Sequence, residues 1–150
     1  MTEVLVAVAI VGMVFAVLLE AFTLGLRMLE QSRRMTIATS LAEEIHEMVL
    51  TLPLSDPEEP THWGLETGEV APDFDDLADL DGQSFSPPLS SDGLLLADQA
   101  DYLQQVTVVS VSDTDFNQVV ADGASDVYRV SVSVTFRGGE VCQLSWLRVR

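Results

Sequence analysis

The first 26 residues constrain the fold of this chain more than any other segment. From Val4 to Leu19 the sequence has no charge, no proline and a single glycine. A helix rises about 1.5 Å per residue, so Val4–Leu26 covers ~35 Å, enough for the ~30 Å hydrocarbon core of a bilayer. The segment is apolar on all sides, which is typical of a helix in lipid or in a large core. Because a chain of 150 residues has no core large enough to surround it, we predict a membrane span within residues 1–26.

Glu20 is the one charge inside this segment after Glu3. It is close enough to the end of the span for its carboxylate to reach the headgroups or to be protonated. The alternative to a span is a secretory signal peptide. That alternative fits less well, because no basic residue precedes Arg27 and no pair of small residues forms a cleavage site after Leu19.

The helical pattern continues into residues 27–52, with a different character. From Met35 onward apolar residues follow the i, i+3, i+4, i+7 spacing of one helix face, and most charged residues fall on the other side. The helix should end before Pro53, since the residue preceding a proline is pushed out of the α region. We therefore predict one helix over residues 3–52, with an amphipathic second half.

The C-terminal part, residues 103–150, has the pattern of an antiparallel sheet. Val127–Phe136 alternates strictly between apolar and polar residues, and Glu140–Val149 follows after a turn expected at Gly138-Gly139. A third strand is expected at Leu103–Ser112, and the loop 113–125 joins it to this hairpin. The apolar face of such a three-stranded sheet must pack against another element. The amphipathic half of the helix supplies that element. The predicted contact residues are Leu41, Ile45 and Val49 on the helix and Val132, Val134 and Trp146 on the strands.

The resulting fold class is α+β, a long N-terminal helix packed on a small antiparallel sheet. Between helix and sheet, residues 53–102 are acidic and rich in proline and glycine. We expect this region to be largely irregular, with one short strand or helical turn.

A cluster of aspartates in this region raises the question of calcium, which prefers clustered oxygen ligands. An EF-hand does not fit, because Leu77 and Ser84 stand where the loop needs acids. We expect solvated acids rather than a metal site. The calcium candidates are Asp73, Asp75, Asp76, Asp79 and Asp81.

The charge of the chain restricts its partners. The formal net charge is −17, there is no lysine, and no arginine occurs between Arg34 and Arg129. A region of this charge repels nucleic acid and anionic lipid headgroups. A solvated acidic surface is the simplest interpretation, and a cation site or a basic protein partner are the alternatives.

The sequence contains no recognisable catalytic set, and we predict a non-enzymatic protein without a cofactor. There is no glycine-rich phosphate loop and no serine in a nucleophile elbow. His46 and His62 lie in a helix and a loop without ligand spacing around them, and His46 is expected to be solvated. Cys142 is the single cysteine and is expected to be a small buried residue.

The start of the chain resembles a known family. Glu3, Val4, Leu5, Val6 and Ala7, with Thr2 as a partial match, are similar to the start of type IV pilins and of the pilin-like proteins (pseudopilins) of type II secretion. Mature chains of that family open with a phenylalanine-threonine-leucine-isoleucine-glutamate run and an apolar helix. The family's short basic leader, which ends in glycine, has no counterpart before Glu3. The resemblance implies a pilin-like fold and a minor pilin or pseudopilin subunit in which Glu3 acts in filament assembly.

The resemblance also implies partners and a location. The partners would be other pilin-like subunits through the N-terminal helix, the bacterial inner membrane before assembly, and a secreted protein substrate. Arg27, Arg33 and Arg34 follow the span, and the positive-inside rule would place that side in the cytoplasm. The family places it outside, and we follow the resemblance. The alternative function is a single-pass, membrane-anchored binding module for a cation or protein ligand, which does not need Glu3.

Overall fold

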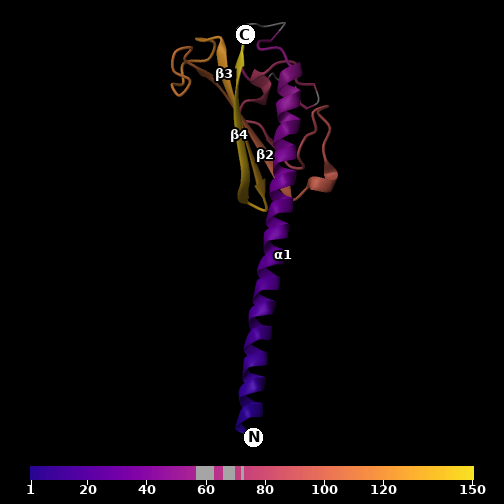
Figure 1. Ribbon diagram of the computed structural model, residues 1–150. Helices are drawn as coiled ribbons and strands as arrows, with labels where there is room; N and C mark the ends of the chain where they lie inside the picture. The colour runs from indigo at the N-terminus through magenta and orange to yellow at the C-terminus, as the bar shows by residue number, and fades with distance from the viewer. Residues whose placement is uncertain (57–62, 66–69, 72) are drawn as a thin grey trace. The chain divides into compact units, whose positions relative to one another are not determined.

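The computed structural model describes residues 1–56, 63–65, 70–71 and 73–150 (Figure 1). These residues form two compact units, Met1–Met35 and Thr36–Arg150. The second unit is called the head below. Helix α1 spans Thr2–Thr51 and contributes residues to both units. The predicted long helix and its end before Pro53 are thus confirmed.

The head contains a four-stranded antiparallel sheet in the order β1-β2-β3-β4. Three long strands were predicted, and a short fourth strand, β1, comes from the region expected to be largely irregular. The strands are β1 (Ser84–Phe85), β2 (Tyr102–Val111), β3 (Val127–Phe136) and β4 (Gly139–Val149), and two short 3-10 helices, η1 (Ala78–Leu80) and η2 (Ala97–Gln99), precede β1 and β2.

The hairpin between β3 and β4 turns one residue earlier than predicted. Phe136 pairs with Gly139, so the turn residues are Arg137 and Gly138. Both have positive φ, 49° and 83°, as the two central residues of a type I′ turn require. The predicted turn at Gly138-Gly139 is wrong because Gly139 is already the first residue of β4. Beyond the turn the register shifts between Val134 and Thr135, a β-bulge that locally increases strand twist.

The outer edge of β2 is closed although β1 is short. β1 pairs only with Gln104 and Gln105. Next to it, the Val106 N–H donates to the Gln83 carbonyl at 2.9 Å and the Val108 N–H donates to Asp81 Oδ1 at 2.8 Å. At the far end the loop after β2 continues the closure, since the Val120 N–H donates to the Ser110 carbonyl at 2.9 Å. Unpaired strand edges invite pairing with other chains, and these bonds remove that possibility at β2.

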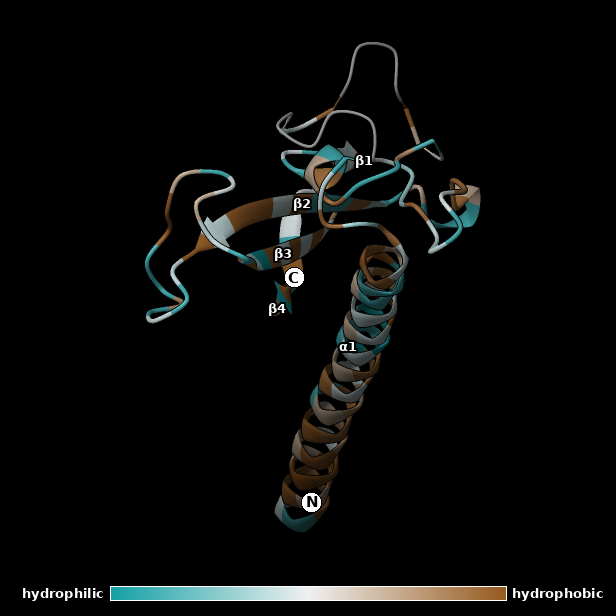
Figure 2. Cartoon of the chain, turned by 90° about the horizontal axis from the view of Figure 1, so that it is seen from above, coloured by the Kyte–Doolittle hydropathy of each residue, from teal (hydrophilic) through white to brown (hydrophobic). Residues whose placement is uncertain are grey.

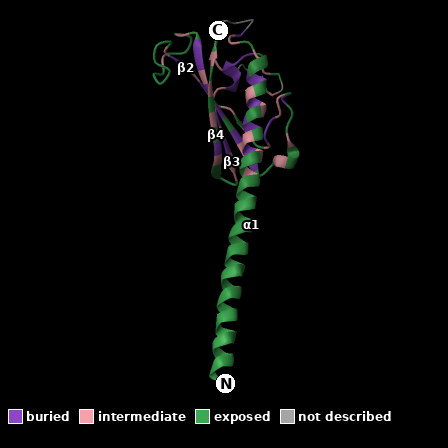
Figure 3. Cartoon of the chain, in the orientation of Figure 1, coloured by how far each residue is buried: buried purple, intermediate pink, exposed green. Residues whose placement is uncertain are grey.

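The core of the head lies between α1 and the inner face of the sheet (Figure 3). The buried side chains of α1 recur with helical spacing and face the valines of β2 and β3, which alternate with period two. Fully burying a valine, leucine, isoleucine or methionine side chain contributes about 1.5–3 kcal/mol. The central members are Ala38, Leu41, Ala42, Ile45, Met48 and Val49 on α1 and Val106, Val108, Val130, Val132 and Val134 on the strands. The predicted α+β fold, with the helix packed on the sheet, is confirmed.

The region 53–102 adds more to the core than its composition suggested. Leu77, Leu80 and Leu89 are at most 1 % exposed and belong to the same cluster. Trp63 stacks on Tyr128 of β3, with ring centroids 5.6 Å apart. The described part of this region therefore covers one side of the helix–sheet core.

The C-terminal end of α1 is capped from the sheet. The last turn of the helix contains no basic residue, but the guanidinium of Arg148 on β4 donates to the carbonyls of Val49 and Leu52, the latter at 2.9 Å. The last carbonyls of a helix have no partner within it and carry partial negative charge. Arg148 satisfies two of them with a charged donor.

Candidate functional site

The first candidate site is the apolar part of α1 within Met1–Met35. Every side chain of this unit is exposed except that of Arg34, which is half-exposed. Figure 2 shows this part of the helix as almost continuously hydrophobic. By length and composition, α1 qualifies as a candidate membrane-spanning helix. The large exposed apolar residues of the predicted span include Val4, Leu5, Val6, Val8, Ile10, Val11, Met13, Val14, Phe15, Val17, Leu18, Leu19, Phe22, Leu24 and Leu26.

Polar side chains in this unit are few before Arg27 and concentrated after it. The Thr23 hydroxyl donates to the Leu19 carbonyl at 2.8 Å, so it adds no unpaired donor to an apolar environment. Arg34 pairs with Glu30 one turn earlier. Glu3 lies in the first turn of α1, where the helix dipole favours a negative charge. The segment between Glu3 and Glu20 therefore presents only apolar side chains.

The second group of predicted residues, at the helix–sheet contact, lies together in the head. Leu41, Ile45, Val49, Val132 and Val134 belong to the buried cluster, and Trp146 is half-buried against it. Cys142 is also buried, as expected, with its Sγ 3.8 Å from Thr39 Oγ1.

The prediction that His46 is solvated is wrong. It is half-buried, and its ring meets Trp146 edge-on with centroids 4.7 Å apart. Aromatic pairs prefer this T-shaped arrangement. The prediction missed the contact because Trp146 lies on the last strand, far away in sequence. His62 lies outside the described residues.

The aspartate cluster also differs from the expectation of solvated acids. Asp76 and Asp79 are 3 % and 2 % exposed. Asp76 Oδ1 accepts the N–H of Ala78 at 2.6 Å and of Asp79 at 3.2 Å. Asp79 Oδ2 in turn accepts the N–H of Asp75 at 3.1 Å and of Asp76 at 3.0 Å. The two carboxylates thus hold the backbone of η1, while Asp73 and Asp75 are exposed as expected.

The electrostatics of this turn are unfavourable for the charged form of Asp76. Burial raises the pKa of its carboxyl above the usual 3.8, and the nearby Asp79 and Asp75 raise the pKa further. The backbone N–H bonds from Ala78 and Asp79 act in the opposite direction on this pKa. Within the described residues, no three His, Cys, Asp or Glu side chains are grouped so as to hold a metal ion.

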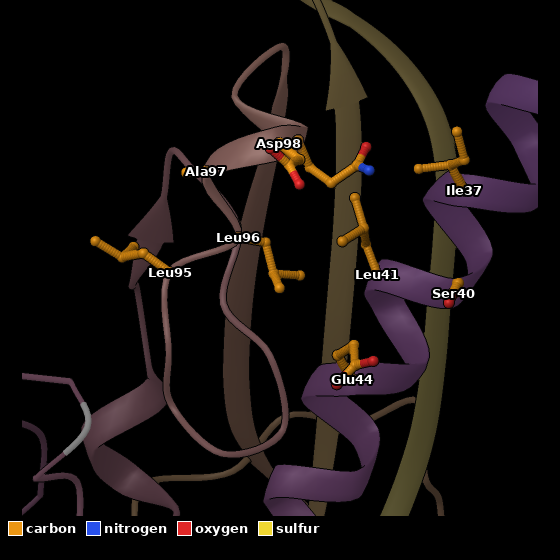
Figure 4. A pocket seen from close by; sticks show the side chains of 9 residues that line it. Ile37, Ser40, Leu41, Glu44, Leu95, Leu96, Ala97 and Asp98 are labelled. Atoms are coloured by element: carbon orange, nitrogen blue, oxygen red, sulfur yellow. The ribbon is translucent and has the colours of Figure 1, made fainter.

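A third feature, which the sequence did not reveal, is a cavity of about 450 Å³ on the head. It lies between α1 and the segment around η2 (Figure 4). The side chains that line it are Ile37, Ser40, Leu41 and Glu44 from α1 and Leu95, Leu96, Ala97, Asp98 and Gln99 from the facing segment. The sequence gives little indication of this cavity, because its two walls lie about fifty positions apart and neither contains a motif.

Comparisons of the chain with protein-family models, with curated proteins and with solved structures find no match.

Proposed function

We propose that this protein is a non-enzymatic minor pilin or pseudopilin subunit of a type IV pilus or of a type II secretion-like filament, anchored in the membrane by its N-terminal helix. The observation that carries the proposal is the exposed apolar surface of α1 from Val4 to Leu26. Surface of this extent is not left in water by a soluble protein and marks a membrane or protein partner.

The head supports the proposal because its core does not use this segment of α1. Its core is complete within Thr36–Arg150, with the helix face, the sheet and the described part of 53–102 packed together. The apolar part of α1 is therefore available for lipid before assembly and for other pilin-like subunits afterwards. We place the helix in a bacterial inner membrane with the head outside the cytoplasm, where a secreted protein would be met.

Glu3 is the residue on which the assembly proposal depends. An acid at the end of an apolar helix is costly in a membrane unless it is interfacial, protonated or paired. We propose that it pairs with the N-terminal amine of a neighbouring subunit and sets the axial register. Two charges at ~4 Å attract by about 1 kcal/mol in water and about 4 kcal/mol at an effective dielectric near ~20, so the pair selects a register without binding strongly.

The test compares Glu3→Gln with Glu20→Gln, two carboxylates at opposite ends of the same exposed segment. The full chain, expressed behind a prepilin leader in cells with a pilin-like assembly system, should fractionate with membranes, resist carbonate extraction and expose the head to protease in spheroplasts. Both variants should keep this behaviour. Glu3→Gln should reduce cross-linking to partner pilins at least tenfold, and Glu20→Gln should change it little.

Two results would count against the proposal. Protection of the head from protease in intact spheroplasts would reverse the orientation. Equal cross-linking of the wild type and Glu3→Gln would show that Glu3 has no role in assembly. It would favour the second candidate, a membrane-anchored binding module. The observation that favours this second candidate is the cavity beside η2.

A further inference from the structure

The cavity beside η2 has an apolar centre and acidic ends. In Figure 4 the side chains of Leu41 and Leu96 lie between those of Glu44 and Asp98. Ile37 contributes further apolar surface from α1. The cavity volume, about 450 Å³, is within the usual ~300–1,000 Å³ of ligand sites.

The wall opposite α1 is held in place by hydrogen bonds. Gln104, which is fully buried, accepts the Leu89 N–H at 2.7 Å and donates to the carbonyls of Leu41 at 2.8 Å and Leu89 at 3.1 Å. The Leu96 N–H donates to the Pro88 carbonyl at 2.7 Å. A ligand would therefore find the wall already formed, which lowers the entropic cost of binding.

Glu44 belongs both to this support and to the cavity. Its Oε2 accepts the Ser91 N–H at 2.7 Å. An ionised carboxylate has about four acceptor sites, so Glu44 can accept further bonds from a ligand while it holds the wall. Asp98 is exposed at the other end of the lining.

The charge around the cavity selects the sign of its ligand. None of the described residues that line it is basic. Two carboxylates in such surroundings repel phosphates and carboxylates and attract cations. A simple metal ion matches the cavity poorly, because within the described residues no three His, Cys, Asp or Glu side chains are grouped so as to hold one.

We propose that this cavity binds an arginine or lysine side chain, next to an apolar residue, on the surface of a partner protein. Both side chains combine an apolar stem with a charged head, which matches the apolar centre and the acidic ends. Arginine matches best, because its planar guanidinium forms paired bonds with carboxylates. The inference concerns the head alone and does not depend on the filament proposal.

The test uses the full chain in zwitterionic phospholipid nanodiscs and the peptide acetyl-Leu-Arg-Leu-amide. Amide NMR signals of Ser91, Leu96 and Gln99 should shift and saturate as the peptide is added. The same peptide with citrulline, a neutral analogue of arginine, and acetyl-Gly-Arg-Gly-amide, which lacks the apolar neighbours, should each bind at least threefold more weakly.

Matched variants locate the site. Exposed charge pairs contribute about 0.2–1 kcal/mol, so Asp98→Asn and Glu44→Gln should each weaken binding by a factor between about 1.4 and 5. A glutamine at position 44 can still accept the Ser91 N–H, which keeps the wall in place. Glu47→Gln, an exposed acid on α1 outside the lining, should leave binding unchanged.

Three outcomes would overturn the inference. The first is the absence of a saturable shift at these amides when acetyl-Leu-Arg-Leu-amide is added to millimolar concentration. The second is equal binding of the arginine and citrulline peptides. The third is an unchanged affinity in Asp98→Asn, because this substitution removes the charge and keeps the size of the side chain. None of these outcomes bears on Glu3 and filament assembly.

Discussion

Helix α1 has a longer first part, residues 1–35, and a shorter second part, Thr36–Thr51, called its first and second halves below, and the two have opposite environments. Residues 1–35 are almost entirely exposed, whereas in Thr36–Thr51 one face is buried in the head. The difference follows from the arrangement of the apolar residues. In the first half they occur on all sides, so no face is singled out for packing within the chain. In the second half they form a stripe, and the stripe determines which face meets the sheet.

The largest expected effect comes from making the same substitution in both halves. Ile45 is 0 % exposed and Ile10 is 56 % exposed. Ile45→Ala should lower the free energy of unfolding of the head by about 2–5 kcal/mol, since it removes buried methylene groups and leaves a cavity. The measurement is urea unfolding of the full chain in micelles, followed by tryptophan fluorescence from the head.

Ile10→Ala is the control, and it should leave this unfolding curve unchanged. Equal destabilisation by the two substitutions would show that the first half also packs within the chain, and would break the comparison.

A smaller effect is expected at the end of the packed half. Arg148→Met keeps the apolar stem but removes the donors to the Val49 and Leu52 carbonyls. Hydrogen bonds with a charged partner contribute about 1.5–3 kcal/mol, and we expect a loss in this range in the same unfolding experiment.

Arg137→Gln is the matched control for Arg148→Met. Arg137 forms an exposed ion pair with Asp101 at 2.8 Å, which should contribute less than about 1 kcal/mol. A loss at Arg137 as large as that at Arg148 would argue that surface charge, rather than capping, stabilises the head.

The smallest effect concerns the pH dependence of stability. Because the pKa of Asp76 is raised in the folded head, the folded state binds this proton more tightly than the unfolded state. The contribution of Asp76 to stability is therefore greatest at low pH and falls as the pH rises above its unfolded value of about 3.8.

Asp76→Asn should flatten this part of the pH profile while keeping the acceptor for the Ala78 and Asp79 N–H groups. The profile is measured by urea unfolding at a series of pH values, with the exposed Asp73→Asn as the control. If the free energy of unfolding of Asp76→Asn still falls with rising pH as it does in the wild type, the pH dependence belongs to other groups.

The predictable parts of the fold are those determined by local periodicity. The helix and the alternation of Val130, Val132 and Val134 could be recognised from their own neighbours in sequence. The turn was predicted one residue too late, at Gly138-Gly139 instead of Arg137-Gly138. The two glycines look alike in the sequence, and only the pairing of Phe136 with Gly139 shows that Gly139 is the first residue of β4.

The unpredicted parts all depend on partners distant in sequence. One short strand or helical turn was expected in residues 53–102, but the position of β1 depends on its pairing with β2. Gln104 is buried because the carbonyls of Leu41 and Leu89 accept its amide hydrogens. Asp76 and Asp79 look like solvent-facing acids until their bonds to η1 are known. A composition argument cannot distinguish a carboxylate in water from one that accepts backbone N–H groups.

The Arg148 cap also has a consequence for the order of events during protein synthesis. Val49 and Arg148 are 99 positions apart, so the end of α1 leaves the ribosome long before its cap exists. At roughly 5–20 residues per second, the delay is about 5–20 s. During that interval the whole apolar first half of α1 has already been synthesised, while the helix end that supports the head lacks its final contact.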